Sequence, residues 1–294
     1  MDSQLNKNQM LSQLLSSYKS QINSAIESDM EQRKQNSELY NACRYALMNG
    51  GKRFRPALVM MIADEIGNRK DVVKAALAVE YFHTASLVVD DLPCMDNEIE
   101  RRGAPSTHIA FNESTALLVS YALIAAGYEN ICLNTNEGSY SQEVRHLALT
   151  NVTRNMGLSG VTGGQYLDLF SQNPGYDEIL EIIRLKTVTL FEIAFVLGWL
   201  FGGGPAGELE NVAQAAHHFG MAFQIADDLG DVSQDKEHSS LNLALSIGVE
   251  RAANLFHVEL SSYRKILFDL KLQGSRIELL ADVLLQSLSE NSHV

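Results

Sequence analysis

Apolar residues recur at intervals of three and four along most of the chain, and this spacing predicts amphipathic helices. Between residues 10 and 49 it predicts two helices, the first with its apolar stripe at positions 11, 14, 15, 18, 22 and 26. Further helices are expected at about residues 56–67, 72–90, 112–132, 142–156, 176–199 and 208–231, with two more that end near residue 289. No segment alternates apolar and polar residues for long enough to predict a strand. The pattern therefore predicts an all-α fold, with about ten helices in one domain over residues 1–294.

Loops are predicted where the helical spacing stops, at residues 103–106, at TNEGSYS (135–141) and at DVSQDKEHSS (231–240). The most apolar stretch, residues 188–204, is interrupted by Glu192 and is shorter than the roughly 20 residues that cross a bilayer. This stretch is therefore expected to be a buried helix, and no transmembrane segment is predicted.

The net charge, the cysteines and the N-terminal residues limit which partners and which cellular location are expected. The formal net charge of −13 argues against a nucleic-acid partner, which needs a basic surface. Cys43, Cys94 and Cys132 are widely spaced and form no CxxC pair, which is typical of a reducing compartment. The N-terminus has neither a secretory signal nor the acid-free, Arg-rich pattern of a transit peptide. A cytoplasmic location is therefore expected.

Two acidic clusters, DDLPCMD (90–96) and DDLGD (227–231), each end a strongly apolar helix. Helical spacing places Asp227 and Asp231 on one face, where like charges repel unless a cation lies between them. Oxygen ligands in this pattern suit Mg²⁺. The alignment of the first cluster stays open, because Pro93 can distort its turn. One such cluster alone would be read as a solvated helix end, but two behind apolar helices favour metal binding. Carboxylates of the two clusters are therefore candidate metal ligands.

Cationic residues accompany the acidic clusters. The turn GGKRFRP (50–56) combines three cations with glycines, and Gly51 permits close backbone approach to an anion. Arg101 and Arg102 follow the first cluster, and Lys186 lies within an apolar helix, where an unpaired charge would be costly. Any one of these runs could be an ordinary surface cluster. Together with two metal sites they indicate a diphosphate substrate, and the absence of a Walker A or GxGxxG pattern argues against a nucleotide.

The motifs GGKRFRP, DDLPCMDNEIERRG, GGQYLDL, LKT and FQIADDLGD occur in the order and at the spacing that the trans-isoprenyl diphosphate synthase family shows. From about residue 40 to residue 285 the chain resembles this family, and DDLPCMDN is most similar to geranylgeranyl diphosphate synthases. The resemblance implies one helical domain around a deep cavity, usually in a homodimer, and a Mg²⁺-dependent prenyltransferase with three ions beside the bound substrate. Isopentenyl diphosphate would be joined to a dimethylallyl, geranyl or farnesyl diphosphate.

The resemblance also assigns roles residue by residue. The Mg²⁺ ligands it implies are Asp90, Asp91, Asp96, Asp227, Asp228 and Asp231. The catalytic residues it implies are Asp90, Asp91, Asp96, Arg101, Lys186, Asp227 and Asp228. Those implied to bind isopentenyl diphosphate are Gly51, Lys52, Arg55, His83 and Arg102. Those implied to contact the allylic diphosphate are Arg101, Lys186, Thr187 and Gln224.

Product length is expected to depend on the residues that precede the first acidic cluster. Ala85 and Ser86 are small, and Ala85 lies about 7 Å below the metal site at the helical rise. Phe82, one turn deeper, is expected to form the floor of the pocket. These residues favour a twenty-carbon geranylgeranyl product, with farnesyl diphosphate synthase as the alternative.

The chain departs from the family pattern in several places. Residues 232–247 form a shortened segment without the family's lysines, with Lys236 as the nearby candidate, and residues 120–123 read SYAL where the family has GDAL. A non-catalytic regulatory subunit is therefore a second alternative. A terpene cyclase would lack the second acidic motif and the GGKRFRP turn, and a di-iron bundle would need Glu-x-x-His pairs.

Overall fold

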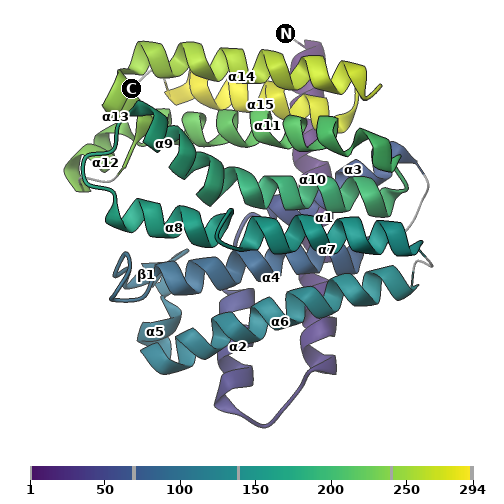
Figure 1. Ribbon diagram of the computed structural model, residues 1–294, viewed down its shortest axis with the longest axis vertical. Helices are drawn as coiled ribbons and strands as arrows, with labels where there is room; N and C mark the ends of the chain where they lie inside the picture. The colour runs from purple at the N-terminus through teal and green to yellow at the C-terminus, as the bar shows by residue number, and fades with distance from the viewer. Residues whose placement is uncertain (1, 68–70, 138–139, 239–240, 292–294) are drawn as a thin grey trace.

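The computed structural model describes residues 2–67, 71–137, 140–238 and 241–291, and in this part of the chain the fold is helical with one short hairpin (Figure 1). The elements, in chain order, are α1 (Asp2–Gln32), α2 (Glu38–Met48), α3 (Phe54–Ile66), α4 (Val73–Asp90), β1 (Glu100–Arg101), β2 (Ala104–Pro105), α5 (Thr107–Ala110), α6 (Glu113–Glu137), α7 (Gln142–Met156), α8 (Val161–Phe170), α9 (Tyr176–Ile183), the π-helical turn η1 (Arg184–Val188), α10 (Thr189–Gly202), the 3₁₀ turn η2 (Ala206–Glu208), α11 (Leu209–Gly230), α12 (Val232–His238), α13 (Leu243–Ile247), α14 (Val249–Asp269) and α15 (Arg276–Asn291). The all-α prediction is confirmed.

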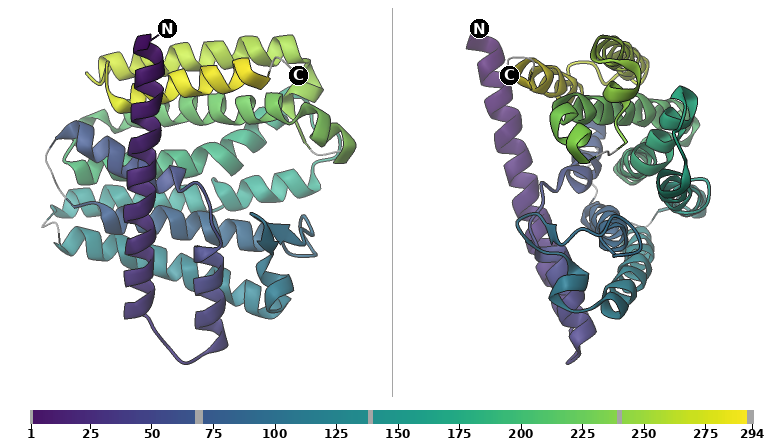
Figure 2. Two further views of the ribbon diagram at one scale, coloured as in Figure 1. Left: turned by 180° about the vertical axis from the view of Figure 1, so that it is seen from behind. Right: turned by 90° about the vertical axis from the view of Figure 1, so that its left-hand side faces the viewer.

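Most of the long helices lie roughly side by side, while α1 crosses them at a steep angle along one side of the molecule (Figure 2). The closest pairs are α4 with α6, α3 with α10, and α11 with α14. The C-terminal end of α4 and the C-terminal end of α11 point to the same side of the bundle (Figure 1). This arrangement brings the two acidic clusters to one end of the molecule.

The centre of the bundle is α10, which confirms the buried helix expected at residues 188–204. Every residue of α10 except Glu192 is buried. Its Phe191 ring lies 5.4 Å from that of Phe219 on α11, and Phe219 lies 5.2 Å from Tyr263 on α14. Each such buried ring contributes about 1.5–3 kcal/mol relative to an exposed one. The aromatic cluster therefore anchors the helices that carry the site.

One helix, α6, is long and apolar enough over residues 113–136 to cross a membrane by length and composition alone. Its apolar window is 44% buried inside the molecule, where it packs against α4. Helices of a protein core pass the same test, so the feature is weak evidence for a membrane span.

Several segments differ from the sequence predictions. The helix α6 continues to Glu137, into the loop expected at residues 135–141. Residues 232–238, predicted as a loop, form α12, because the backbone N–H of Asp235 donates to the carbonyl of Asp231 and the segment holds good helix formers such as Lys236. Residues 104–105, also predicted as a loop, pair with residues 100–101 as the antiparallel hairpin β1–β2. Residues 161–170 form α8, which was not predicted because two consecutive glycines disfavour a helix. The first helix starts at Asp2 and not near residue 10.

Candidate active site

The first acidic cluster follows α4 in a closed turn. The backbone N–H of Asp96 donates to the carbonyl of Asp90 at 2.9 Å, so the chain folds back on itself between the two residues. Burial, together with the charges of Asp96 and Asp91, raises the pKa of Asp90 to about 6, although Lys186 acts in the opposite direction. Burial likewise raises the pKa of Asp96. Both carboxylates are thus in an environment that a cation would relieve.

The hairpin β1–β2 sets the two arginines that follow this cluster. Arg102 and Gly103 occupy its two-residue turn with φ of 57° and 81°, as a type I′ turn requires. Arg101 Nε donates to Asp91 Oδ1 at 2.9 Å, and Arg102 Nη1 donates to the carbonyl of Gly50 at 3.1 Å. Gly51 has φ of 108°, a conformation that other residues adopt only with strain, and a Cβ there would lie 2.6 Å from Arg102 Nη1 and displace this guanidinium.

The second cluster ends α11 and divides into exposed and buried carboxylates. Asp227 and Asp231 are exposed, whereas Asp228 is buried and both of its carboxylate oxygens are engaged. Asp228 Oδ1 accepts a hydrogen bond from Gln224 Nε2 at 2.8 Å, and Oδ2 accepts one from the backbone N–H of Leu243 at 2.8 Å. Burial raises the pKa of Asp228 to about 6. The side chain of Asp227 reaches solvent, but its carboxylate is partly desolvated by surrounding protein atoms, and this desolvation and the charge of Asp231 raise its pKa.

The π-helical turn η1 places Lys186 and Thr187 between the two clusters. Lys186 Nζ donates to Asp168 Oδ2 on α8 at 2.5 Å. Burial would lower the pKa of Lys186, but the charges of Asp168, Asp90 and Asp96 together raise it, so the ammonium stays charged. Thr187 Oγ1 donates to Gln224 Oε1 at 2.9 Å, which continues the hydrogen-bond chain to the second cluster.

A group of cationic side chains lies next to both clusters, since Arg55 acts on Asp227 and Arg101 is bound to Asp91. Arg55 stacks over the Phe191 ring at 4.6 Å, and its Nε atom and the Nδ1 atom of His83 are buried without a hydrogen-bond partner among the described residues. Burial and the charges of Arg55, Arg102 and Arg101 hold the pKa of His83 well below its usual value. Orphaned, buried donors beside several cations suit an anion with several oxygens.

Lys52 is exposed, and its charge acts on Asp227. Arg53, which lies between Lys52 and Arg55 in the GGKRFRP turn, has a structural role instead. Arg53 is buried, with φ of 54°, and its guanidinium pairs with Glu80 and donates to Asn23 Oδ1 and to the carbonyl of Leu47. Within one turn, Lys52 therefore lies beside the second acidic cluster, whereas Arg53 stabilises the fold.

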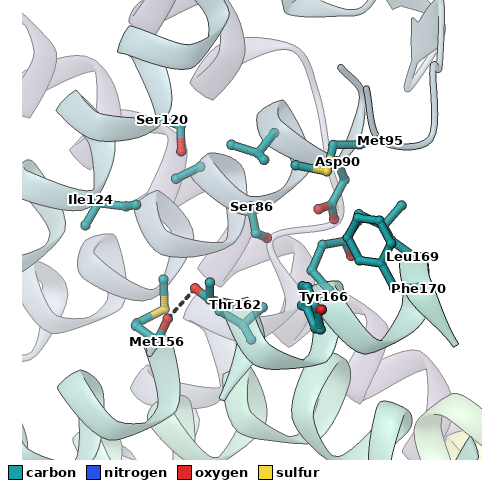
Figure 3. Close-up of a pocket in the computed structure, with 14 residues that line it drawn as sticks. Ser86, Asp90, Met95, Ser120, Ile124, Met156, Thr162, Tyr166, Leu169 and Phe170 are labelled. Carbon is teal, nitrogen blue, oxygen red and sulfur yellow. Dashed lines mark hydrogen bonds between the residues drawn. The ribbon is translucent and has the colours of Figure 1, made fainter. Parts of the chain in front are cut away.

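An apolar cavity of about 290 Å³ opens beside Asp90 between α4, α6 and α8 (Figure 3). The expected Ala85 and Ser86 line it, together with Ser120 and Ile124 on the α6 side. Tyr166, Leu169 and Phe170 line it from α8. Phe82, expected as the floor, packs its ring against Gly127 and lies 5.2 Å from the Tyr128 ring, outside the lining of this cavity.

Two functional residues were not predicted from the sequence. Asp168 accepts the hydrogen bond that fixes Lys186, and its signal was its place in the motif GGQYLDL (163–169). A Cβ at Gly164 of the same motif would lie 2.5 Å from the backbone nitrogen of Lys186, so this glycine permits the close packing of α8 on η1. Asn242 donates through Nδ2 to the Asp228 carbonyl at 2.7 Å and to Asp235 Oδ2 at 2.7 Å. Its sequence context offered no signal, because the contact depends on how the chain returns after α12.

Comparison with known proteins gives a consistent picture. The family model for polyprenyl synthetase matches residues 36–242 of the chain, a range that begins close to the expected residue 40 but ends before residue 285. Geranylgeranyl pyrophosphate synthase 3, chloroplastic, from Arabidopsis thaliana is 39% identical over 202 residues, which are 67% of this chain and 56% of that protein. Putative geranylgeranyl pyrophosphate synthase 8, chloroplastic, from the same plant is 38% identical over 223 residues, which are 74% of this chain and 61% of the relative.

The match therefore spans less than two thirds of each relative's own length. Among solved structures, a geranyltransferase from Legionella pneumophila superposes with a TM-score of 0.82 at 26% identity, over 96% of this chain and 98% of that one. The structural likeness thus extends past residue 242 through the C-terminal helices.

Proposed function

Because the chain belongs to the polyprenyl synthetase family, we propose that it is a Mg²⁺-dependent trans-prenyltransferase that joins isopentenyl diphosphate to an allylic diphosphate. The observation that carries this proposal is the order of groups in the site. Asp90 of the first acidic cluster lines an apolar cavity of about 290 Å³. Lys186, whose ammonium group interacts with Asp90, lines a smaller neighbouring pocket together with Asp228 of the second cluster. A substrate with a diphosphate head and a hydrocarbon tail matches both halves of the site.

The donor set fits Mg²⁺. Burial and mutual repulsion raise the pKa of Asp90, Asp96 and Asp227, and a hard divalent cation would remove that cost. We propose that three ions are held by Asp90, Asp91 and Asp96 on one side and by Asp227 and Asp231 on the other. When bound, Mg²⁺ neutralises charge on the diphosphate group that leaves. Asp228, with both oxygens hydrogen-bonded, supports the cluster through Gln224 and the Leu243 backbone.

We propose that two groups of cationic and polar side chains each bind one of the two substrates. Lys52, Arg55, His83 and Arg102 form the pocket proposed for isopentenyl diphosphate, and Gly51 keeps that pocket open. Lys186, Thr187, Gln224 and Arg101 would orient the allylic diphosphate so that its C–O bond points toward the apolar cavity. Fixed cations in a site that excludes water stabilise the negative charge that develops on the leaving group.

The reaction then needs no protein nucleophile. The allylic C–O bond breaks, and its electron pair leaves with the diphosphate. The double bond of isopentenyl diphosphate attacks the allylic cation to form the new C–C bond, and a proton leaves from C2 of the added unit to the released diphosphate.

We propose geranylgeranyl diphosphate as the product, with farnesyl diphosphate as the alternative. The support is the pair of small residues, Ala85 and Ser86, at the wall of the cavity. Purified protein with Mg²⁺ and labelled isopentenyl diphosphate would be offered dimethylallyl, geranyl or farnesyl diphosphate, and the products sized by chromatography. A twenty-carbon product supports the proposal, whereas a fifteen-carbon product keeps the reaction but rejects this account of the cavity.

The regulatory-subunit alternative draws on the segment after the second acidic cluster. Asp228 has no free carboxylate oxygen in the described structure, and the exposed Lys236 on α12 is the candidate cation of this shortened segment. The same assay decides between the two functions. No product from any primer, in protein that is folded by circular dichroism, favours the non-catalytic subunit.

We further propose a homodimer and a cytoplasmic location. Leu117, Leu118 and Tyr121 are exposed on one side of α6, and a second copy of the chain would cover them. Cys43, Cys94 and Cys132 are all free thiols, which suits a reducing compartment.

A further inference from the structure

Three potential metal ligands meet between α11 and α14, away from the acidic clusters. His217 and His218 lie on α11 and Glu259 lies on α14, and one ligand atom from each side chain falls within 4.8 Å of the others. His217 is ten residues before Asp227 on the same helix, which corresponds to about 15 Å along its axis. The cluster is therefore separate from the proposed Mg²⁺ sites.

The contacts within the cluster are only partly explained by the fold. His218 Nδ1 lies 2.6 Å from Glu259 Oε2, and this hydrogen bond joins the two helices. The rings of His217 and His218 lie 5.3 Å apart at 77°. Within the described part of the chain, however, the imidazole of His217 makes no hydrogen bond. A partly buried imidazole without a polar partner beside a second imidazole and a carboxylate has the elements of an incomplete coordination shell.

Among the described residues, the neighbouring charged side chains do not serve as hydrogen-bond partners of His217. Arg184 and Glu192 act electrostatically on His217, but each is bound elsewhere. Arg184 donates to both oxygens of Glu181 at 2.7 and 2.6 Å. Glu192 Oε1 accepts hydrogen bonds from Asn151 and Asn155.

We propose that His217, His218 and Glu259 form a zinc site that links α11 to α14. Two imidazoles and one carboxylate match a ligand set that Zn²⁺ uses when a fourth position is left to water. Imidazole nitrogen also favours Zn²⁺ over Mg²⁺, which prefers oxygen. His218 and Glu259 are already joined by a hydrogen bond, so an ion would take the place of the shared proton. The two bonded atoms would move slightly apart, and the imidazole of His217 would move toward them.

The test is a Zn²⁺ titration of the full chain in the presence of excess Mg²⁺ and without diphosphate. Wild-type protein is expected to bind one Zn²⁺ per chain, and the variant D227N/D231N is expected to keep that ion. H217Q/H218Q is expected to lose it, and E259Q, which exchanges a carboxylate ligand for a neutral amide, should weaken binding by more than the roughly 10- to 100-fold that loss of an outer-shell partner costs. Co²⁺ in place of Zn²⁺ would give a visible spectrum of nitrogen ligation in wild type and in D227N/D231N, but not in H217Q/H218Q.

Two results would overturn the proposal. One is the absence of stoichiometric Zn²⁺ binding to the wild type. The other is a bound ion that survives in H217Q/H218Q but is lost in D227N/D231N, because that ion would belong to the acidic clusters. If H217Q/H218Q fails to fold, E259Q serves as the deciding variant, with unweakened binding as the contrary outcome. The helix link also predicts that Zn²⁺ raises the Tm of wild type but not of the folded histidine variant.

Discussion

His83 on α4 lies among Arg55, Arg102 and Arg101, with its Nδ1 atom buried and unpaired among the described residues. Burial and those positive charges hold its pKa well below the ordinary value of 6.5, so the folded protein keeps a neutral imidazole where the unfolded chain takes up a proton. This single side chain thus couples the diphosphate pocket to pH. The sequence did not indicate the coupling, because a lone histidine in an apolar helix is most often a core residue.

The pH dependence of stability follows from that coupling. Below pH 6.5 the unfolded state binds a proton that the native state does not, so the free energy of unfolding falls as pH decreases. One proton contributes at most about 1.4 kcal/mol per pH unit. In urea denaturation between pH 7.5 and 5, His83→Gln should show a shallower loss of stability than the wild type. Parallel pH profiles of the two proteins would contradict the shifted pKa.

Arg53 and Lys52 are neighbours in one turn with opposite environments, and they make a matched pair. Arg53→Ala leaves Glu80 as a buried, unpaired charge, which should lower the free energy of unfolding by about 3–5 kcal/mol. Lys52→Ala removes an exposed charge and should leave the urea midpoint unchanged while it weakens binding of isopentenyl diphosphate. Equal stability losses in the two variants would show that Arg53 has no special structural role.

At the scale of elements, the packing of α4 on α6 defines the wall of the apolar cavity. A Cβ at Gly127 would lie 2.5 Å from Cε1 of Phe82, whose ring is fully buried. The contact holds Phe82 against α6 and outside the cavity, and this explains why the residue expected at the floor lies elsewhere. Helical spacing puts Phe82 one turn below Ala85 and Ser86, which do line the cavity. The contact that directs the Phe82 ring elsewhere is made by a glycine on another helix, which the spacing within α4 does not reveal.

Substitution of that glycine should disturb the α4–α6 contact. Gly127→Ala is expected to cost about 1–3 kcal/mol of stability, because a fully buried ring cannot move without repacking. Gly207→Ala is the control, since a Cβ there meets nothing within 4 Å. Phe82→Leu combined with Gly127→Ala should recover part of the loss, with a coupling energy above about 0.5 kcal/mol in a double-mutant cycle. Additive effects would mean that the two positions do not press on each other.

The same wall predicts a change in product. Ala85→Phe should fill the cavity beside Asp90 and shorten the longest product by at least one five-carbon unit. Chromatography of the labelled products measures the effect. Phe82→Leu is the matched control and should leave the chain length unchanged, because Phe82 does not line this cavity. An unchanged product from Ala85→Phe would place the growing chain elsewhere.

At the scale of the whole molecule, most of the long helices and their order could be read from apolar spacing, and both acidic clusters and the basic turn were identified by their residue types. The contacts that other segments make with these clusters could not be predicted. The helix α12 interrupts an expected loop, Asn242 returns to cap Asp228, and Asp168 reaches Lys186 from a helix that two glycines disguised. Each of these contacts joins residues whose spacing along the chain carries no periodic signal.

The exposed apolar side of α6 predicts the state of association. Leu118 and Tyr121 are 51% and 62% exposed, and a polar substitution there removes area that a dimer would bury. Leu118→Glu with Tyr121→Glu should shift the protein from twice the chain mass of 32.5 kDa to that mass in light scattering. Phe268→Glu, at an exposed apolar position on α14, should not. A wild-type protein of single chain mass would reject the dimer.

The π-helical turn at Arg184–Val188 also sets the phase between two halves of one continuous helix. Lys186 faces the acidic clusters, whereas Phe191 and the residues after it face the aromatic core. A π turn holds one residue more than a regular turn, and one residue corresponds to about 100° of rotation. Loss of any one residue here would therefore swing either the ammonium group or the core rings out of place. A deletion in this segment should therefore be more harmful than a substitution, because only a deletion changes the rotation between the two halves of the helix.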